Sequence, residues 1–77
     1  MAFHVISFYK YVKIAQPQTL QAHFRTICEQ LHLFGRILIA QEGVNGAVSG
    51  TPKAIEQFKE KIRKHGLFSD LTFREQV

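Results

Sequence analysis

The chain has 77 residues, of which 45% are hydrophobic and 21% are charged, and ten Lys and Arg residues against six Asp and Glu give a formal charge of +4. This is the composition of one small globular domain, and it excludes a disordered chain and a collagen-like repeat. A domain of this length buries only roughly 60% of the surface that its unfolded chain exposes, so we expect marginal stability and little volume for an enclosed active site.

The cellular compartment is indicated by cysteine use and by the lack of long apolar segments. The single cysteine, Cys28, cannot form an intrachain disulfide, which fits a reducing compartment. Residues 1–7 contain no basic leader, and the longest aliphatic run, Ile37–Ala40, is far shorter than the ~20 residues needed to cross a bilayer. We therefore expect a cytoplasmic protein with no membrane partner.

The first half of the chain predicts a strand, a helix and a second strand. Residues 3–12 are rich in aromatic and β-branched side chains, which is typical of a strand. Pro17 suits a first helical turn, and the expected helix ends at Phe34-Gly35. Residues 36–41, with their aliphatic centre, then predict a largely buried strand. The apolar stripe of the helix consists of Leu20, Phe24, Ile27, Cys28 and Leu31.

The second half predicts a hairpin, a second helix and a last strand. The segment 42–46 is expected to form the turn, because its Asn-Gly pair supplies the positive φ angles that tight hairpins require, and 47–49 resume extended chain. Thr51 is the expected N-cap of a helix that begins at Pro52 and continues to Gly66, and residues 71–74 alternate as a half-buried strand does. The helix carries its apolar stripe at Ile55, Phe58 and Ile62.

The order βαββαβ predicts the α+β class and a ferredoxin-like two-layer sandwich. Two helices then cover one face of a four-stranded antiparallel sheet, and the other face stays open. The elements fill residues 1–77 as one domain. Of the two alternating sets on the first strand, we expect the one with Ser7 and the tyrosines on the open face.

Catalytic and metal chemistry find little support. The glycines at 43, 46 and 50 do not have the spacing of a phosphate loop, and the four histidines are too scattered to bind a metal. Cys28, on an apolar stripe, is expected to be a structural thiol with a raised pKa. His65 is expected in the last turn of the second helix, facing its C-terminal dipole. We expect no catalytic residue, metal or cofactor in this segment.

Basic residues form two groups. Five of them lie on the second helix among Glu56 and Glu60, and we expect a solvated face there. The other group places Tyr9-Lys10-Tyr11 and Lys13 at the end of the first strand and Arg36 at the start of the second, so that bases could stack on rings while phosphates contact cations. An RRM is disfavoured, because the third strand has no aromatic residue.

Three stretches together resemble one family: residues 6–11 (Ile-Ser-Phe-Tyr-Lys-Tyr), 34–37 (Phe-Gly-Arg-Ile) and 40–50 (Ala-Gln-Glu-Gly-Val-Asn-Gly-Ala-Val-Ser-Gly). They are similar to the N-terminal domain of the rhodanese-related tRNA uridine hydroxylases. The resemblance implies an acylphosphatase-like ferredoxin fold, followed in the same chain by a rhodanese domain. In that family a loop cysteine of the rhodanese domain is needed for oxygen-dependent hydroxylation of the wobble uridine of certain tRNAs.

The resemblance implies no catalytic residue here, because Cys28 does not correspond to the rhodanese cysteine. Its implied partners are tRNA and the rhodanese domain, while any cofactor of the full enzyme stays open. Acylphosphatase activity is not expected, because residues 12–17 lack the glycine-rich loop and its arginine. The alternative is a protein-interaction module that packs on a partner domain or on a second copy. The residues expected to bind tRNA, with Lys13 added for its charge, are Tyr9, Lys10, Tyr11, Lys13, Arg36, Glu42 and Asn45.

Overall fold

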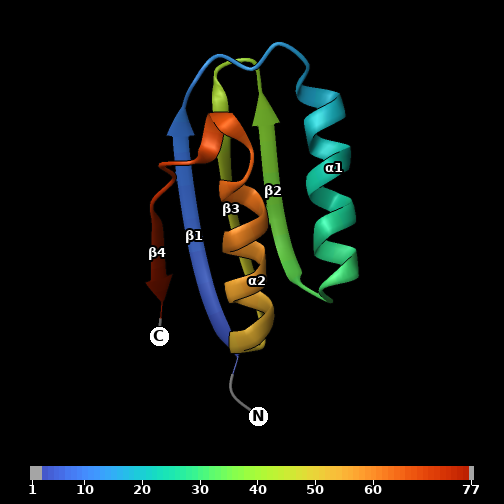
Figure 1. Cartoon of the computed structure of the whole chain (residues 1–77), viewed down its shortest axis with the longest axis vertical. Coiled ribbons are helices and arrows are strands. Elements are labelled where there is room, and N and C mark those ends of the chain that lie inside the picture. The colour runs from blue at the N-terminus through green and yellow to red at the C-terminus, as the bar shows by residue number, and fades with distance from the viewer. Residues whose placement is uncertain (1–2, 77) are drawn as a thin grey trace.

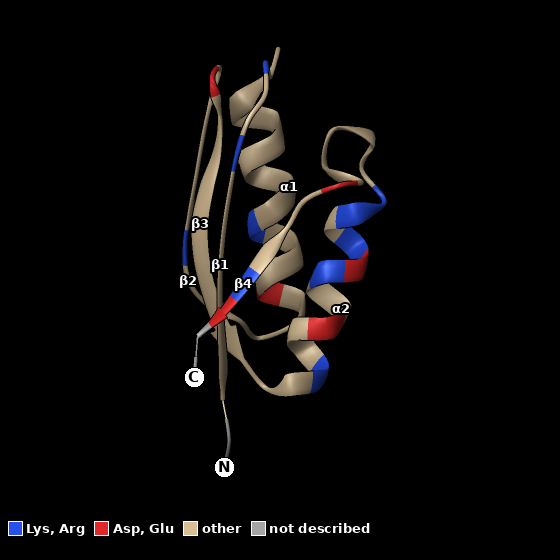
Figure 2. Cartoon of the chain, turned by 90° about the vertical axis from the view of Figure 1, so that its left-hand side faces the viewer, with Lys and Arg blue, Asp and Glu red and all other residues tan. Residues whose placement is uncertain are grey.

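The computed structural model describes residues 3–76, the last of them through its backbone alone, as two layers (Figure 1). Both long helices lie against the same face of a single sheet, and no element of residues 3–76 covers the opposite face (Figure 2). This confirms the predicted βαββαβ order, to which a short 3-10 helix is added. The elements are β1 (His4–Tyr11), α1 (Pro17–Gln30), β2 (Phe34–Ala40), β3 (Gly43–Gly50), α2 (Pro52–Arg63), η1 (Gly66–Phe68) and β4 (Phe73–Gln76).

The sheet has the strand order β2-β3-β1-β4, and every neighbouring pair is antiparallel. The two central strands, β1 and β3, come from different halves of the chain. The predicted ferredoxin-like α+β fold is therefore confirmed.

The core fills the layer between the sheet and the helices. Successive residues of a strand point to opposite faces, so Ile6 and Phe8 of β1 face the helices and are almost fully buried. The ring of Phe8 packs on Phe58 of α2 and on Phe73 of β4, at centroid distances of 5.8 and 5.5 Å. Phe24 of α1 meets Phe68 of η1 at 5.6 Å. Aromatic contacts thus link both helices, η1 and the sheet.

The first helix ends earlier than predicted. It stops at Gln30, and His32, with a φ of 55°, reverses the chain while the Leu33 amide donates to the Cys28 carbonyl at 2.9 Å. Phe34-Gly35 therefore begins β2, and its assignment as the end of the helix was wrong. Because His32, and not a glycine, adopts this left-handed conformation, the sequence contained no glycine that would indicate the end of the helix.

The hairpin turn lies at Gln41-Glu42, so of the predicted turn at 42–46 only Glu42 is in it, and the assignment of Asn45-Gly46 to the turn was wrong. Gly43, with a φ of 152°, pairs with Ala40 and begins β3. The amide of Val12 donates to the Glu42 carbonyl at 3.0 Å, and that of Ile14 donates to the Gln41 carbonyl at 2.9 Å. These bonds anchor the turn to the chain that leaves β1.

The second helix begins as predicted, with the Thr51 hydroxyl accepting from the Ala54 amide at 3.2 Å. It ends at Arg63, however, and His65 lies beyond it, where its Nδ1 accepts from the Leu67 amide at 3.3 Å and caps η1. The expected contact of His65 with the dipole of α2 was therefore wrong. Strand β4 starts two residues later than predicted, because Leu71 is buried in the core before the chain reaches the sheet.

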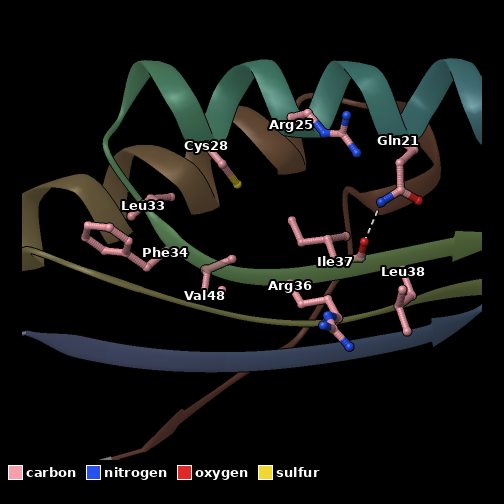
Figure 3. A pocket seen from close by; sticks show the side chains of 10 residues that line it. Gln21, Arg25, Cys28, Leu33, Phe34, Arg36, Ile37, Leu38 and Val48 are labelled. Atoms are coloured by element: carbon pink, nitrogen blue, oxygen red, sulfur yellow. Dashed lines mark hydrogen bonds between the residues drawn. The ribbon is translucent and has the colours of Figure 1, made fainter.

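One side chain of α1 covers part of the outer edge of β2. Gln21 donates from Nε2 to the Ile37 carbonyl (Figure 3), and its Oε1 accepts from the Ile39 amide at 3.1 Å. The side-chain amide thereby makes two of the hydrogen bonds that a neighbouring strand would make. Unpaired edge strands are templates for association, so this bond pair protects the sheet.

We expect Gly43→Ala to lower the free energy of unfolding by about 3 kcal/mol or more. Its Cβ would lie 2.1 Å from the Lys10 carbonyl oxygen, at a φ of 152°. Urea unfolding checks this, with Gly66→Ala as the matched control, because a Cβ there meets nothing within 4 Å. Equal stabilities of the two variants would contradict the close approach at Gly43.

We expect Gln21→Leu to lower the free energy of unfolding by about 1–2 kcal/mol, because two partly buried backbone groups lose their partner. It should also cause association through β2, measured as a concentration-dependent mass in analytical ultracentrifugation. Gln18→Leu adds the same side chain at an exposed position of the same helix and should stay monomeric. If both variants associate alike, the protection is not due to Gln21.

Candidate nucleic-acid interface

The sheet face away from the helices carries a coherent set of exposed side chains, which we name the open sheet face. The strand register places them in rows: Phe34, Ser49 and Val5 lie side by side, and Leu38, Asn45 and Tyr9 form another row. The expectation that Ser7 and the tyrosines lie on this side is confirmed by the burial of Ile6 and Phe8 on the other. The open sheet face consists of Phe3, Val5, Ser7, Tyr9, Tyr11, Phe34, Arg36, Leu38, Asn45, Ala47, Ser49 and Arg74.

Aromatic rings gather at both ends of the open sheet face. Phe3 and Phe34 stack at a centroid distance of 6.4 Å, and Phe34 is 64% exposed. At the other end Tyr9 and Tyr11 meet edge to face at 6.0 Å and are 67% and 86% exposed. Rings of this size are usually buried, and their exposure on one side makes this face a candidate interaction surface.

Two arginines flank the middle of the open sheet face. Arg36 pairs with Ala47, Ala47 with Ser7, and Ser7 with Arg74, so one row crosses all four strands. Three strand spacings of about 4.8 Å place the two arginine backbones about 14 Å apart. No Asp or Glu belongs to this face among residues 3–75, because Glu75, the one acidic residue of the strands, points to the helix side and pairs with Lys59.

Of the residues predicted to bind tRNA, four lie together on the open sheet face: Tyr9, Tyr11, Arg36 and Asn45. Lys13 and Glu42 are exposed in the two loops at the Tyr11 end, which the bond from the Val12 amide to the Glu42 carbonyl holds together. Asn45 reaches the face because it lies within β3, opposite Tyr9 and Leu38, and not in a turn.

Lys10 lies on the opposite side of β1 from its two tyrosine neighbours. Its ammonium donates to the Leu67 carbonyl at 2.7 Å and to Asp70 Oδ1 at 2.6 Å, and its side chain is 27% exposed. The hydrogen bond and the charge of Lys10 lower the pKa of the Asp70 carboxyl below its ordinary value. The structure therefore does not bring Lys10 to the rings with which the sequence grouped it.

The sequence placed Phe3 on the open face with Ser7 and the tyrosines, but it gave no sign that Phe34, Leu38 and Arg74 belong to this surface. Phe34 was missed because it was assigned to the end of the helix. The alternation of Phe73 and Arg74 in the sequence predicts that they point to opposite faces, but the position of Arg74 opposite Ser7 depends on the pairing of β1 with β4.

Two depressions flank the pair of Tyr9 and Asn45. One, of about 800 Å³, extends toward the hairpin turn and is lined by Tyr11, Leu38 and Glu42 among others. The other, of about 470 Å³, lies toward β4 and includes Arg74. Planar groups stacked on Tyr9 therefore have room on both sides.

A third depression, of about 320 Å³, lies between α1 and β2 and includes Cys28 (Figure 3). Burial first, and the neighbouring Glu29 charge second, raise the pKa of the Cys28 thiol, as predicted from its place on an apolar stripe. Arg25 lies on the helix side of β2 while Arg36 projects from the other side, so their guanidinium groups do not converge (Figure 3). The thiol is protonated at neutral pH and suits packing.

The loop after β1, where acylphosphatases bind their anion, is engaged internally. The amides of Val12 and Ile14 donate to the hairpin carbonyls and are not available to a phosphate. Within residues 3–76 no three His, Cys, Asp or Glu side chains converge as metal ligands. No helix in the described part of the chain is long and apolar enough to cross a membrane.

A βαββαβ sandwich with one open sheet face is a domain of the ferredoxin-like class. The family model described as "UPF0176 acylphosphatase like domain" matches residues 3–77, and the chain belongs to this family. This confirms the family indicated by the three motif stretches.

Several curated relatives share one name. The chain is 40% identical over 74 residues to the tRNA uridine(34) hydroxylase of Staphylococcus epidermidis, covering 96% of this chain and 23% of the relative. It is 40% identical over 72 residues to that of Bacillus velezensis, covering 94% and 22%, and 36% identical over 72 residues to that of Listeria welshimeri, covering 94% and 23%. The chain therefore spans about a quarter of the length of these relatives.

We expect Asp70→Asn to be less stable than the wild type at neutral pH, and the difference to disappear in acid. The folded-state pKa of Asp70 lies below the unfolded value of about 3.9, so its contribution is present above that pH and is lost as the pH falls through the folded-state pKa. Urea unfolding at pH 7, 5, 4 and 3 measures it, with the exposed Glu60→Gln as control for loss of one negative charge. A constant difference across this range would contradict the ion pair with Lys10.

Proposed function

We propose that this chain is the non-catalytic domain of a rhodanese-type enzyme that hydroxylates uridine 34 of tRNA with oxygen, and that it helps to dock the tRNA. In this proposal it is the N-terminal domain of a cytoplasmic protein whose rhodanese domain supplies the catalytic cysteine. The observation that carries the docking role is the open sheet face, where exposed rings and two arginines lie together and where the strands among residues 3–75 present no carboxylate. The name shared by the relatives supports tRNA as the substrate.

In this proposal catalysis belongs to the rhodanese domain, because the chemistry of this domain does not suit it. The thiol of Cys28 is half-buried and has a raised pKa, which disfavours the thiolate that a nucleophile needs. In the loop after β1, the amides of Val12 and Ile14 donate to the hairpin carbonyls, so these two are not available to a developing negative charge. Binding and orientation of the substrate are the contributions left to this domain.

Each predicted residue has a role in this proposal. Tyr9 and Tyr11 stack on bases, while Arg36 and Lys13 contact phosphates. Asn45 lies beside Tyr9 and presents both a donor and an acceptor to a base edge. Glu42, in the turn at the rim of this surface, limits where a phosphate backbone can approach. Lys10 acts indirectly, by anchoring the segment before β4 through Leu67 and Asp70.

A protein-interaction module is the second candidate, and one observation favours it. Val5 and Leu38 are exposed aliphatic side chains on the open sheet face, at 37% and 58%. Aliphatic groups gain little from nucleic acid, but they are stabilised by the apolar surface of a partner domain or of a second copy. The rhodanese domain of the same chain would be such a partner.

In the full-length enzyme, we expect Arg36→Glu and Lys13→Glu to weaken tRNA binding. The slope of log affinity against log salt should become shallower by about 0.7 to 0.9 for each phosphate that the variant no longer neutralises. Filter binding or fluorescence anisotropy at several salt concentrations measures both quantities. Lys61→Glu, an equal charge change on the exposed side of α2, is the control and should leave the slope nearly unchanged. If the Arg36 and Lys13 variants have an unchanged affinity for tRNA and an unchanged salt slope, the docking role is wrong.

A further inference from the structure

From the layout of the open sheet face, we infer that it binds an unpaired RNA segment of about four nucleotides, with bases stacked at its two aromatic ends and phosphates held by Arg36 and Arg74 between them. This inference rests on the proposed docking function and specifies the part of the RNA that is bound. It adds Phe34 and Arg74 to the residues that contact RNA.

The spacing along β1 suits several nucleotides. Phe3 and Tyr9 are six residues apart, which is about 20 Å in an extended strand. Ser7 lies between them in the row that joins Arg36 to Arg74. The order along the face is therefore an aromatic pair, a cationic pair and a second aromatic pair. An RNA strand that runs parallel to β1 would therefore contact a pair of aromatic rings, then the two arginines, then a second pair of aromatic rings.

The exposure of the rings selects for unpaired bases. In a duplex the faces of the bases are covered by their neighbours, so a protein ring can stack only on a base that has left the helix. Tyr11 and Phe34 present most of their surface to solvent at opposite ends of the face. Between them, Ser7 and Ala47 are small, and a sugar-phosphate chain can approach the sheet closely.

The charge of the face favours RNA over a protein partner. Within residues 3–75 the face has two charged residues, Arg36 and Arg74. The planar guanidinium groups of arginine bind phosphates through paired hydrogen bonds and stack on bases. The acidic residues near it are engaged or peripheral: Asp70 pairs with Lys10, and Glu42 lies in the hairpin turn. Figure 2 shows blue and red alternating along α2, on the far side of the molecule, so the mixed charge lies away from this surface.

The test uses the full-length enzyme with two probes, a single-stranded RNA octamer and a blunt RNA duplex of matched composition, in fluorescence anisotropy at fixed salt. We expect the octamer to bind more tightly than the duplex. Tyr9→Ala and Phe34→Ala should each weaken octamer binding about 10-fold while changing duplex binding little. Arg74→Gln should weaken octamer binding and reduce its salt slope, and Lys61→Gln on α2 should do neither. Equal binding of the two probes overturns the inference.

The outcomes separate this inference from the proposed function. If Arg36→Glu weakens tRNA binding but Tyr9→Ala and Phe34→Ala leave octamer binding unchanged, the domain docks tRNA without stacking, and only the inference fails. If no variant on the face changes the binding of either RNA, both fail.

A second measurement tests whether the face is accessible in the full-length enzyme. A cysteine introduced by Leu38→Cys, labelled with maleimide and measured peptide by peptide, should react rapidly in the free enzyme and be protected by the octamer. Slow labelling without RNA would mean that another part of the protein or a second copy covers the face, which overturns the inference.

Discussion

The register between the two central strands is the constraint on which both sides of this domain depend. Side chains on a strand alternate between faces, so a shift of one residue between β1 and β3 would turn Ile6 and Phe8 out of the core. No Cβ fits at Gly43, where it would lie 2.1 Å from the Lys10 carbonyl oxygen. The amides of Val12 and Ile14 hold the adjoining turn. Together with the burial of Ile6 and Phe8, these features favour the one register that gives the open sheet face its composition.

The same alternation gives the two sides of β1 different roles. Among its even-numbered residues, Ile6 and Phe8 belong to the core and Lys10 bonds the segment before β4, while its odd-numbered side chains form the open sheet face. Because Asp70 lies just ahead of β4, the Lys10 contact also helps to position Arg74 on the other side of the sheet. The two layers are thus coupled through a single strand, and a core-side ion pair supports a residue that we propose to contact RNA.

The sequence predicted the order of the elements because each long segment has one clear period, as in the stripe of Ile55, Phe58 and Ile62. It failed where local preference and pairing disagree. Asn45-Gly46 favours a turn, yet pairing with both neighbouring strands outweighs that preference, and His32 reverses the chain without a glycine. Tyr9, Tyr11, Arg36 and Asn45 were found from chemistry and motif. Arg74 was not, because its row depends on contacts between distant parts of the chain.

Besides protecting the edge of β2, the Gln21 side chain affects the rate at which one backbone amide exchanges its hydrogen with solvent. Its two hydrogen bonds join α1 to β2, so the Ile39 amide is shielded by a helix and not by another strand. That hydrogen can exchange with solvent only when its bond to the Gln21 side chain opens. Its exchange rate therefore reports how often the contact between α1 and β2 opens, while the amides between β1 and β3 report the opening of the whole domain. One glutamine makes the two motions separately observable in the same molecule.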